Sequence, residues 1–153
     1  MTYLTAAMAS ASLLISAWTG SSGQATAWTW TLYEGEGPLV LANEVPDTPQ
    51  LRTTLECAAG SGIARVSVYG GPLVAGFASV TSGSGASAAQ AQAQAEVGRG
   101  GKISLAVRTD HPVVGQFVST GDLAVAVGSQ RQTVTVEPAH LAKLRRFADL
   151  CSG

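Results

Sequence analysis

Apolar and polar residues alternate in short runs along most of the chain after residue 27. In "WTWTLYE", which starts at Trp28, both tryptophans and Leu32 fall on one face, and the threonines and Tyr33 fall on the other. This period of two is typical of half-buried β-strands. Glycine-rich segments such as 60–62 and 70–72 separate the runs and indicate turns. The pattern predicts a mainly β protein with about ten short strands, arranged as an antiparallel β-sandwich or a barrel.

The run "VVGQFVST", residues 113–120, is connected to the next run through Gly121 and Asp122. A second pair, Gly128 and Ser129, joins "LAVAV" to "QRQTVTVE". Two-residue connections of these types suit hairpin turns, whose twist matches that of the flanking strands. We therefore expect residues 113–120 to form a strand.

The segment "AAQAQAQAEV", residues 88–97, carries two conflicting signals. Alanine, glutamine and glutamate favour helices, whereas strict alternation favours a strand. A helix would scatter the glutamines around its axis and leave no apolar stripe to bury. We therefore predict a strand. The segment is low in charge and lacks proline, so at a sheet edge it could pair with a second copy and produce a homo-oligomer.

The end of the chain departs from the period of two. Pro138 suits a first helical turn, and Leu141, Leu144, Phe147 and Cys151 then recur on one side. This spacing predicts one C-terminal amphipathic helix, residues 138–151, that packs its apolar stripe on the sheet.

The first residues of the chain resemble a signal peptide. No charged residue occurs before Glu34, and "LTAAMASASLLISAW" is an apolar stretch that precedes the small residues Ala25 and Ala27. We expect a signal peptide at 1–27, one β-rich domain at 28–153, and periplasmic or secreted localisation. The apolar stretch is shorter than a typical membrane-spanning helix. No Lys or Arg precedes it, so an N-terminal segment buried in a cytosolic fold is the alternative.

Cys57 and Cys151 are the two cysteines, and they do not form a C-x-x-C pair. In an oxidising compartment, two cysteines in a small domain most simply form one structural disulfide. The predicted helix carries Cys151 on its apolar stripe and would deliver it to the strand that carries Cys57. Two buried free thiols are the alternative.

Composition argues against several kinds of ligand. The net charge of −1 gives no global attraction to nucleic acid or to an anionic membrane. The basic cluster of Lys143, Arg145 and Arg146 lies near a predicted helix C-terminus, where the helix dipole favours cations. We find no phosphate or dinucleotide loop, no metal-ligand spacing and no nucleophile motif. The sequence therefore predicts no cofactor and no metal, and it identifies no catalytic residue.

Four residues are candidates for binding. Asp110 and His111 lie in "TDHP", which predicts a turn; alternatively, Asp110 orients the His111 ring in a cryptic enzyme site. Trp28 and Trp30 share a strand face, which predicts core packing; alternatively, they form a platform on which a ligand stacks.

Three stretches resemble those of small exported β proteins from alphaproteobacteria. They are "LRTTLECAAGSGIARVSV", "FVSTGDLAVAVGSQRQTVTV" and "LAKLRRFADLC". The resemblance implies export and a bridge between a mid-chain cysteine, Cys57, and Cys151 in the terminal helix. It implies no mechanism.

Three classes of function remain after these exclusions. We expect an exported, non-catalytic binding or envelope-associated interaction module, stabilised by one disulfide, whose partner is a protein or an envelope component. The first alternative is an inhibitor of a hydrolase that inserts the loop "EGEGPLVLANEVPDTPQ" into a cleft. The second is an enzyme with a site near Asp110 and His111.

Overall fold

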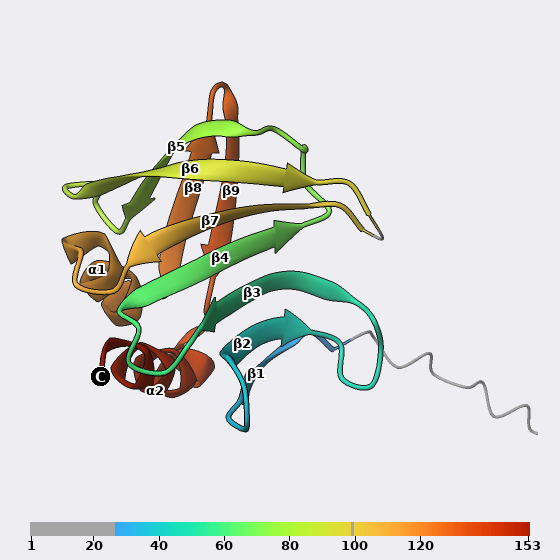
Figure 1. The fold of residues 1–153 in the computed structure, drawn as a ribbon, viewed down its shortest axis with the longest axis vertical. Coiled ribbons are helices and arrows are strands. Elements are labelled where there is room, and N and C mark those ends of the chain that lie inside the picture. Colours follow the sequence, from blue (N-terminus) through green and yellow to red (C-terminus); the bar gives the residue numbers. More distant parts are fainter. Residues whose placement is uncertain (1–26, 99) are drawn as a thin grey trace, which may run out of the picture.

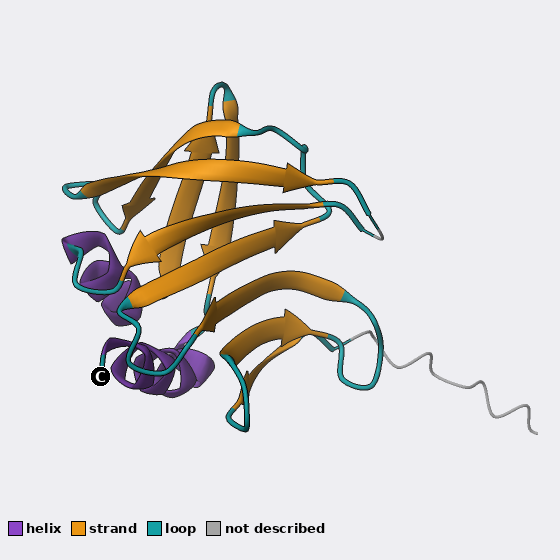
Figure 2. Ribbon diagram, viewed as in Figure 1, coloured by secondary structure: helices purple, strands orange, loops and turns teal. Residues whose placement is uncertain are grey.

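The computed structural model describes residues 27–98 and 100–153, and it confirms a mainly β, antiparallel fold with a C-terminal helix (Figures 1 and 2). The described strands form one sheet of nine, in the order β1-β2-β3-β4-β7-β6-β5-β8-β9. Their bounds are β1 Thr29–Tyr33, β2 Leu39–Glu44, β3 Leu51–Cys57, β4 Ile63–Tyr69, β5 Gly76–Ser82, β6 Ala88–Glu96, β7 Lys102–Arg108, β8 Asp122–Val127 and β9 Gln130–Thr135. The sheet curls into a half-barrel, and β8 and β9 lie behind β4 and β7 in Figure 1.

Residues 113–120 form a helix, so our prediction of a strand there is wrong. The helix, α1 (Pro112–Thr120), begins with a proline, and the Nδ1 atom of His111 caps it by accepting from the Val113 N–H at 3.2 Å. It ends at Gly121, whose φ of 83° lies in the left-handed region and whose N–H donates to the Phe117 carbonyl. Proline at the first position and glycine after the last are both helix signals, and here they outweigh the β-branched residues between them.

The C-terminal helix is confirmed, although its first turn is tighter than expected. A 3₁₀ turn, η1 (Pro138–His140), leads into α2 (Leu141–Ser152). Cys57 and Cys151 form a disulfide with their Cα atoms 5.9 Å apart, which confirms the predicted bridge. The N–H groups of Gly60 and Gly62 donate to the carbonyls of Leu150 and Cys151, each at 2.9 Å. The end of α2 is therefore held to the β3–β4 turn by one covalent bond and two hydrogen bonds.

The segment "AAQAQAQAEV" forms β6, as predicted, but β6 is not an edge strand. It pairs with β5 along Ala88–Ala93 and with β7 at Gln94, Ala95 and Glu96. The edges of the sheet are β1 and β9. The predicted pairing of two copies required this segment to lie at a sheet edge, and β6 lies between β5 and β7 instead.

The proposed inhibitor loop, residues 34–50, is not one loop. Its middle is β2, which pairs with β1 and β3 and buries Leu39 and Leu41. Insertion of the whole segment into a cleft would dismantle the sheet. The predicted signal peptide, 1–27, lies outside the described residues except for Ala27. In the described part of the chain, no helix has the length and apolar character needed to span a bilayer.

Candidate functional site

The concave inner face of the sheet changes character along β2, β3 and β4. Leu41, Leu55 and Val66 are cross-strand neighbours, and α1 and α2 cover this apolar part of the face. Two residues further along the strands, the corresponding neighbours are Asn43, Thr53 and Val68, with Trp30 of β1 beside Asn43. Residues paired across strands point to the same side of a sheet. The inner face therefore continues past the helices as a mixed polar and apolar floor.

A β-bulge directs a charged side chain toward this floor. Asn43 pairs with Thr53 but Glu44 pairs with Leu51, so Arg52 is an extra residue on β3. A bulge of this kind bends the strand and re-aims a side chain. The Arg52 guanidinium lies 3.9 Å from the centre of the Trp28 ring, in cation–π geometry. Arg52 and Trp28 together form the rim of the floor.

Strand β9 forms the opposite wall. The indole Nε1 of Trp30 donates to the carbonyl of Thr135 at 3.2 Å, so the side chain bridges the two edge strands of the half-barrel. At the far end, Gln132 Nε2 donates to the Pro72 carbonyl at 3.5 Å. Between these contacts lies a groove of about 400 Å³, within the usual range for ligand pockets. Its lining residues are Trp30, Asn43, Arg52, Thr53, Val68, Tyr69, Thr133, Val134, Thr135 and Glu137.

Asn43 is the least expected residue of the groove floor. Its side chain is 7% exposed, and its Oδ1 has no hydrogen-bond partner among the described residues. A buried acceptor without a partner costs about 1–3 kcal/mol of stability. The oxygen itself is shielded from the groove, so a ligand with an N–H or O–H donor would satisfy this acceptor once the Asn43 side chain rotates toward the groove. The charges at the rim, Arg52 and Glu137, are of opposite sign, so the groove has no single strong field.

Trp28 and Trp30, which the sequence singled out, both belong to this region. Trp30 is 1% exposed and lines the floor, whereas Trp28 is half-buried under Arg52. Our sequence reading missed Asn43, Arg52 and Glu137. Asn43 had a visible signal, because in "LVLANE" it takes the inward position that follows Leu39 and Leu41. The bulge at Arg52 has no comparable signal.

Asp110 and His111 lie in a different part of the molecule and have separate partners. Arg108 donates to both carboxylate oxygens of Asp110, at 2.9 and 2.6 Å, and this contact lowers the pKa of the Asp110 carboxyl below its ordinary value. The His111 ring caps α1. A second groove of about 400 Å³ adjoins Asp110, and its walls include Ser61, Gly62 and Ser152. The hydrogen bonds of Ser61 and Ser152 link each hydroxyl to nearby backbone, so among the described contacts neither serine bonds to His111.

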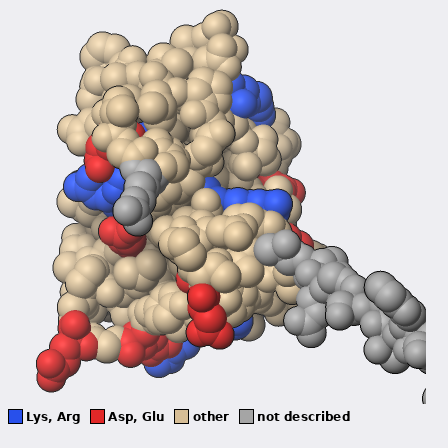
Figure 3. Space-filling view, turned by 90° about the vertical axis from the view of Figure 1, so that its right-hand side faces the viewer, with Lys and Arg blue, Asp and Glu red and all other residues tan. Residues whose placement is uncertain are grey.

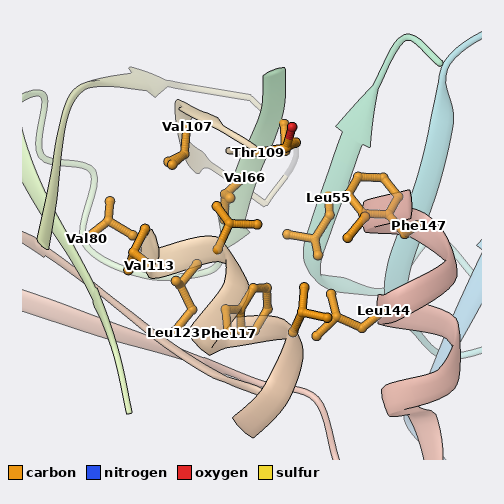
Figure 4. Close-up of a pocket in the computed structure, with 14 residues that line it drawn as sticks. Leu55, Val66, Val80, Val107, Thr109, Val113, Phe117, Leu123, Leu144 and Phe147 are labelled. Carbon is orange, nitrogen blue, oxygen red and sulfur yellow. The ribbon is translucent and has the colours of Figure 1, made fainter. Parts of the chain in front are cut away.

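A third space lies in the core between the two helices and the sheet (Figure 4). Leu55 and Val66 from the sheet, Phe117 from α1, and Leu144 and Phe147 from α2 point toward one another around it. Its volume is about 30 Å³, room for little more than one water molecule, and its lining is apolar. This space is a packing void of the core and is too small for a ligand.

Charge does not identify a further site. Figure 3 shows lysines, arginines and acidic residues in small separate groups on a mostly uncharged face. Residues 27–98 and 100–153 contain no group of three or more His, Cys, Asp or Glu side chains placed to hold a metal ion. Comparisons of the chain with family models, with curated proteins and with solved structures find no match.

Proposed function

We propose that this protein is an exported, non-catalytic binding module whose ligand is a protein or an envelope component. The binding site in this proposal is the groove between β9 and the floor of Trp30, Asn43, Thr53 and Val68. The observation that carries the proposal is the Asn43 Oδ1 atom, which is buried on the groove floor and has no partner in the described part of the chain.

The energetics of Asn43 favour binding over a purely structural role. A leucine of similar size at this position would avoid the loss of about 1–3 kcal/mol that an unpaired buried acceptor causes. The free protein already bears that loss, so a ligand hydrogen bond made when the Asn43 side chain rotates toward the groove adds to affinity without a new desolvation penalty at this atom. By the same reasoning, we expect the ligand to carry a hydrogen-bond donor and to contact the apolar surface that Trp30 and Val68 form.

Two features support export. The Cys57–Cys151 disulfide is of the kind that persists in oxidising compartments. Residues 1–27 have the apolar core and small-residue site of a signal peptide. The resemblance to small exported alphaproteobacterial proteins agrees with both. We infer that the protein works in the periplasm or outside the cell.

Site-specific photocrosslinking in the native host tests the binding site. We expect p-benzoylphenylalanine at Thr133, on the groove wall, to give a defined crosslinked species. The matched control places it at Phe77, an aromatic position on β5 that is 83% exposed and outside the groove lining. Adding Asn43→Leu to the Thr133 probe should reduce the crosslinked species at least tenfold. Equal crosslinking from Phe77, or a Thr133 crosslink that survives Asn43→Leu, would contradict the proposal.

Intact mass of the protein recovered from its host tests export. We expect a chain that begins at Trp28 and gains two alkyl groups only after reduction. A chain that retains residues 1–27 and has two freely alkylated thiols would place the protein in a reducing compartment.

A further inference from the structure

The free side of β9 presents unpaired backbone toward the groove. The Val136 N–H donates to the Gly121 carbonyl at 2.7 Å, on the side of β8. In an antiparallel strand the hydrogen-bonding direction alternates from residue to residue, so Thr133 and Thr135 direct their N–H and C=O groups away from β8. The bond from Trp30 Nε1 to the Thr135 carbonyl agrees with this assignment. Within the described residues, β9 has no strand on its other side.

The other edge strand, β1, is covered by α2. Lys143 Nζ donates to the Trp30 carbonyl at 2.5 Å, and Arg146 forms two hydrogen bonds with Glu34, at 2.7 and 2.9 Å. Lysine at an edge and a covering helix both prevent unwanted strand pairing. The edge of β9 differs, because its sequence "QRQTVT" has one charge and no proline. β9 is therefore the edge that can accept another strand.

The directions of the strands determine how a further strand would fit. Each strand in the sheet is antiparallel to its neighbours, so the first and the ninth, β1 and β9, run parallel to each other. A strand added to the free edge of β9 and antiparallel to it would be the tenth, and it would continue the alternation of the sheet. Every second side chain of that strand would point inward, toward Asn43 and Thr53.

We propose that the groove takes an extended segment of a partner polypeptide, added as an antiparallel strand to the free edge of β9. The Thr133 N–H and C=O and the Thr135 N–H bind its backbone. An inward Ser, Thr, Asn or Gln side chain donates to Asn43 Oδ1 once the Asn43 side chain has rotated toward the groove. Small polar side chains fit best, because the floor is half polar and its rim charges cancel. This inference rests on the proposed function and goes further by naming the ligand as a β-strand whose inward side chains are small, polar and uncharged.

A synthetic peptide tests the inference with the full chain. The probe is an end-blocked peptide, Lys-Thr-Val-Thr-Val-Thr-Val-Lys, and its affinity is measured by titration of the ¹⁵N-labelled protein. Thr133→Pro removes the outward N–H and leaves the pairing with β8 intact, since proline is tolerated at a sheet edge. We expect at least a tenfold loss of affinity. The matched control, Thr133→Val, keeps the N–H and should bind like the unchanged protein.

A second probe tests the same contact with the unchanged protein, so the result does not require Thr133→Pro to fold. The same peptide, N-methylated at alternate residues so that it lacks the donors facing β9, should bind at least tenfold more weakly. Equal binding by the methylated peptide, or by Thr133→Pro, overturns strand addition. Failure of the peptide to bind overturns it as well. Suppose strand addition fails but the Thr133 photocrosslink still depends on Asn43. The groove then remains the binding site, and its ligand is of another class, such as a glycan. If the photocrosslink does not depend on Asn43 either, the proposed function fails as well.

Discussion

Two rows of the inner face, one under the helices and one in the groove, lie two residues apart on the same three strands. Leu41, Leu55 and Val66 meet α1 and α2, and the first of these is fully buried. Asn43 and Thr53 continue the same face without a covering helix. The sheet is apolar where its own chain covers it and carries hydrogen-bonding groups where the chain leaves it open. Under the proposed function, the helix-covered row serves stability and the groove row serves recognition.

Truncation of a side chain in the helix-covered part should have the largest effect. Phe147 is 3% exposed and fills the space between α2 and the sheet. We expect Phe147→Ala to lower the free energy of unfolding by about 3–5 kcal/mol, the usual range for a buried phenylalanine. Phe77→Ala is the control, because Phe77 is 83% exposed, and it should change stability by less than about 0.5 kcal/mol. Urea unfolding followed by circular dichroism measures both, and similar losses would remove the contrast between core and surface.

Removal of the disulfide should have the next largest effect. The bridge closes a loop with a sequence separation of 94, and we expect Cys57→Ala with Cys151→Ala to cost about 2–5 kcal/mol. Hydrogen exchange distinguishes the two rows in this variant. When the variant and the unchanged protein are compared at equal global stability, amide protons of α2 should exchange faster in the variant. Those of Thr53 and Val68 should exchange only through global unfolding in both proteins. Selective loosening of the groove row instead would show that the two rows are not independent.

Replacement of Asn43 should have the smallest effect on stability, and the opposite sign. Asn43→Leu removes the unpaired acceptor, and we expect a gain of about 1 kcal/mol in the absence of ligand. Leu41→Asn is the mirror-image control, on the same strand and face but under the helices, and it should destabilise the protein. The denaturant concentration at the unfolding midpoint measures both changes, provided that the slope of unfolding free energy against denaturant is unchanged. Loss of stability in both variants would mean that Asn43 is an ordinary structural residue.

Local patterns in the sequence were sufficient for much of the fold. Alternation identified the strands, including β6, and the apolar spacing of Leu144, Phe147 and Cys151 identified α2 and its disulfide. Helix α1 was missed because Gly121 and Asp122 were interpreted as a hairpin turn, whereas Gly121 ends a helix that begins at Pro112. A glycine in the left-handed region is compatible with both a hairpin turn and the end of a helix, so Gly121 alone does not distinguish them.

The groove depends on long-range pairing that no local pattern encodes. Its wall and floor come from β9 and from β1 to β4, which meet only because β4 pairs with β7 and β5 pairs with β8. Asn43 could have been found as a polar residue at an inward position. The approach of Thr135 to Trp30 could not, because it results from the curl of the whole sheet.

The disulfide also has a mechanical consequence. If the protein is pulled from its two ends, tension passes from β1 through β2 and β3 to Cys57 and crosses directly to Cys151. The backbone between the two cysteines, which includes β9, lies outside this covalent path and cannot be drawn out while the bond is intact. Only the short segments outside the bridge can extend. A module tethered at both ends would therefore keep one wall of its groove, β9, unstretched, while the β1 side yields first.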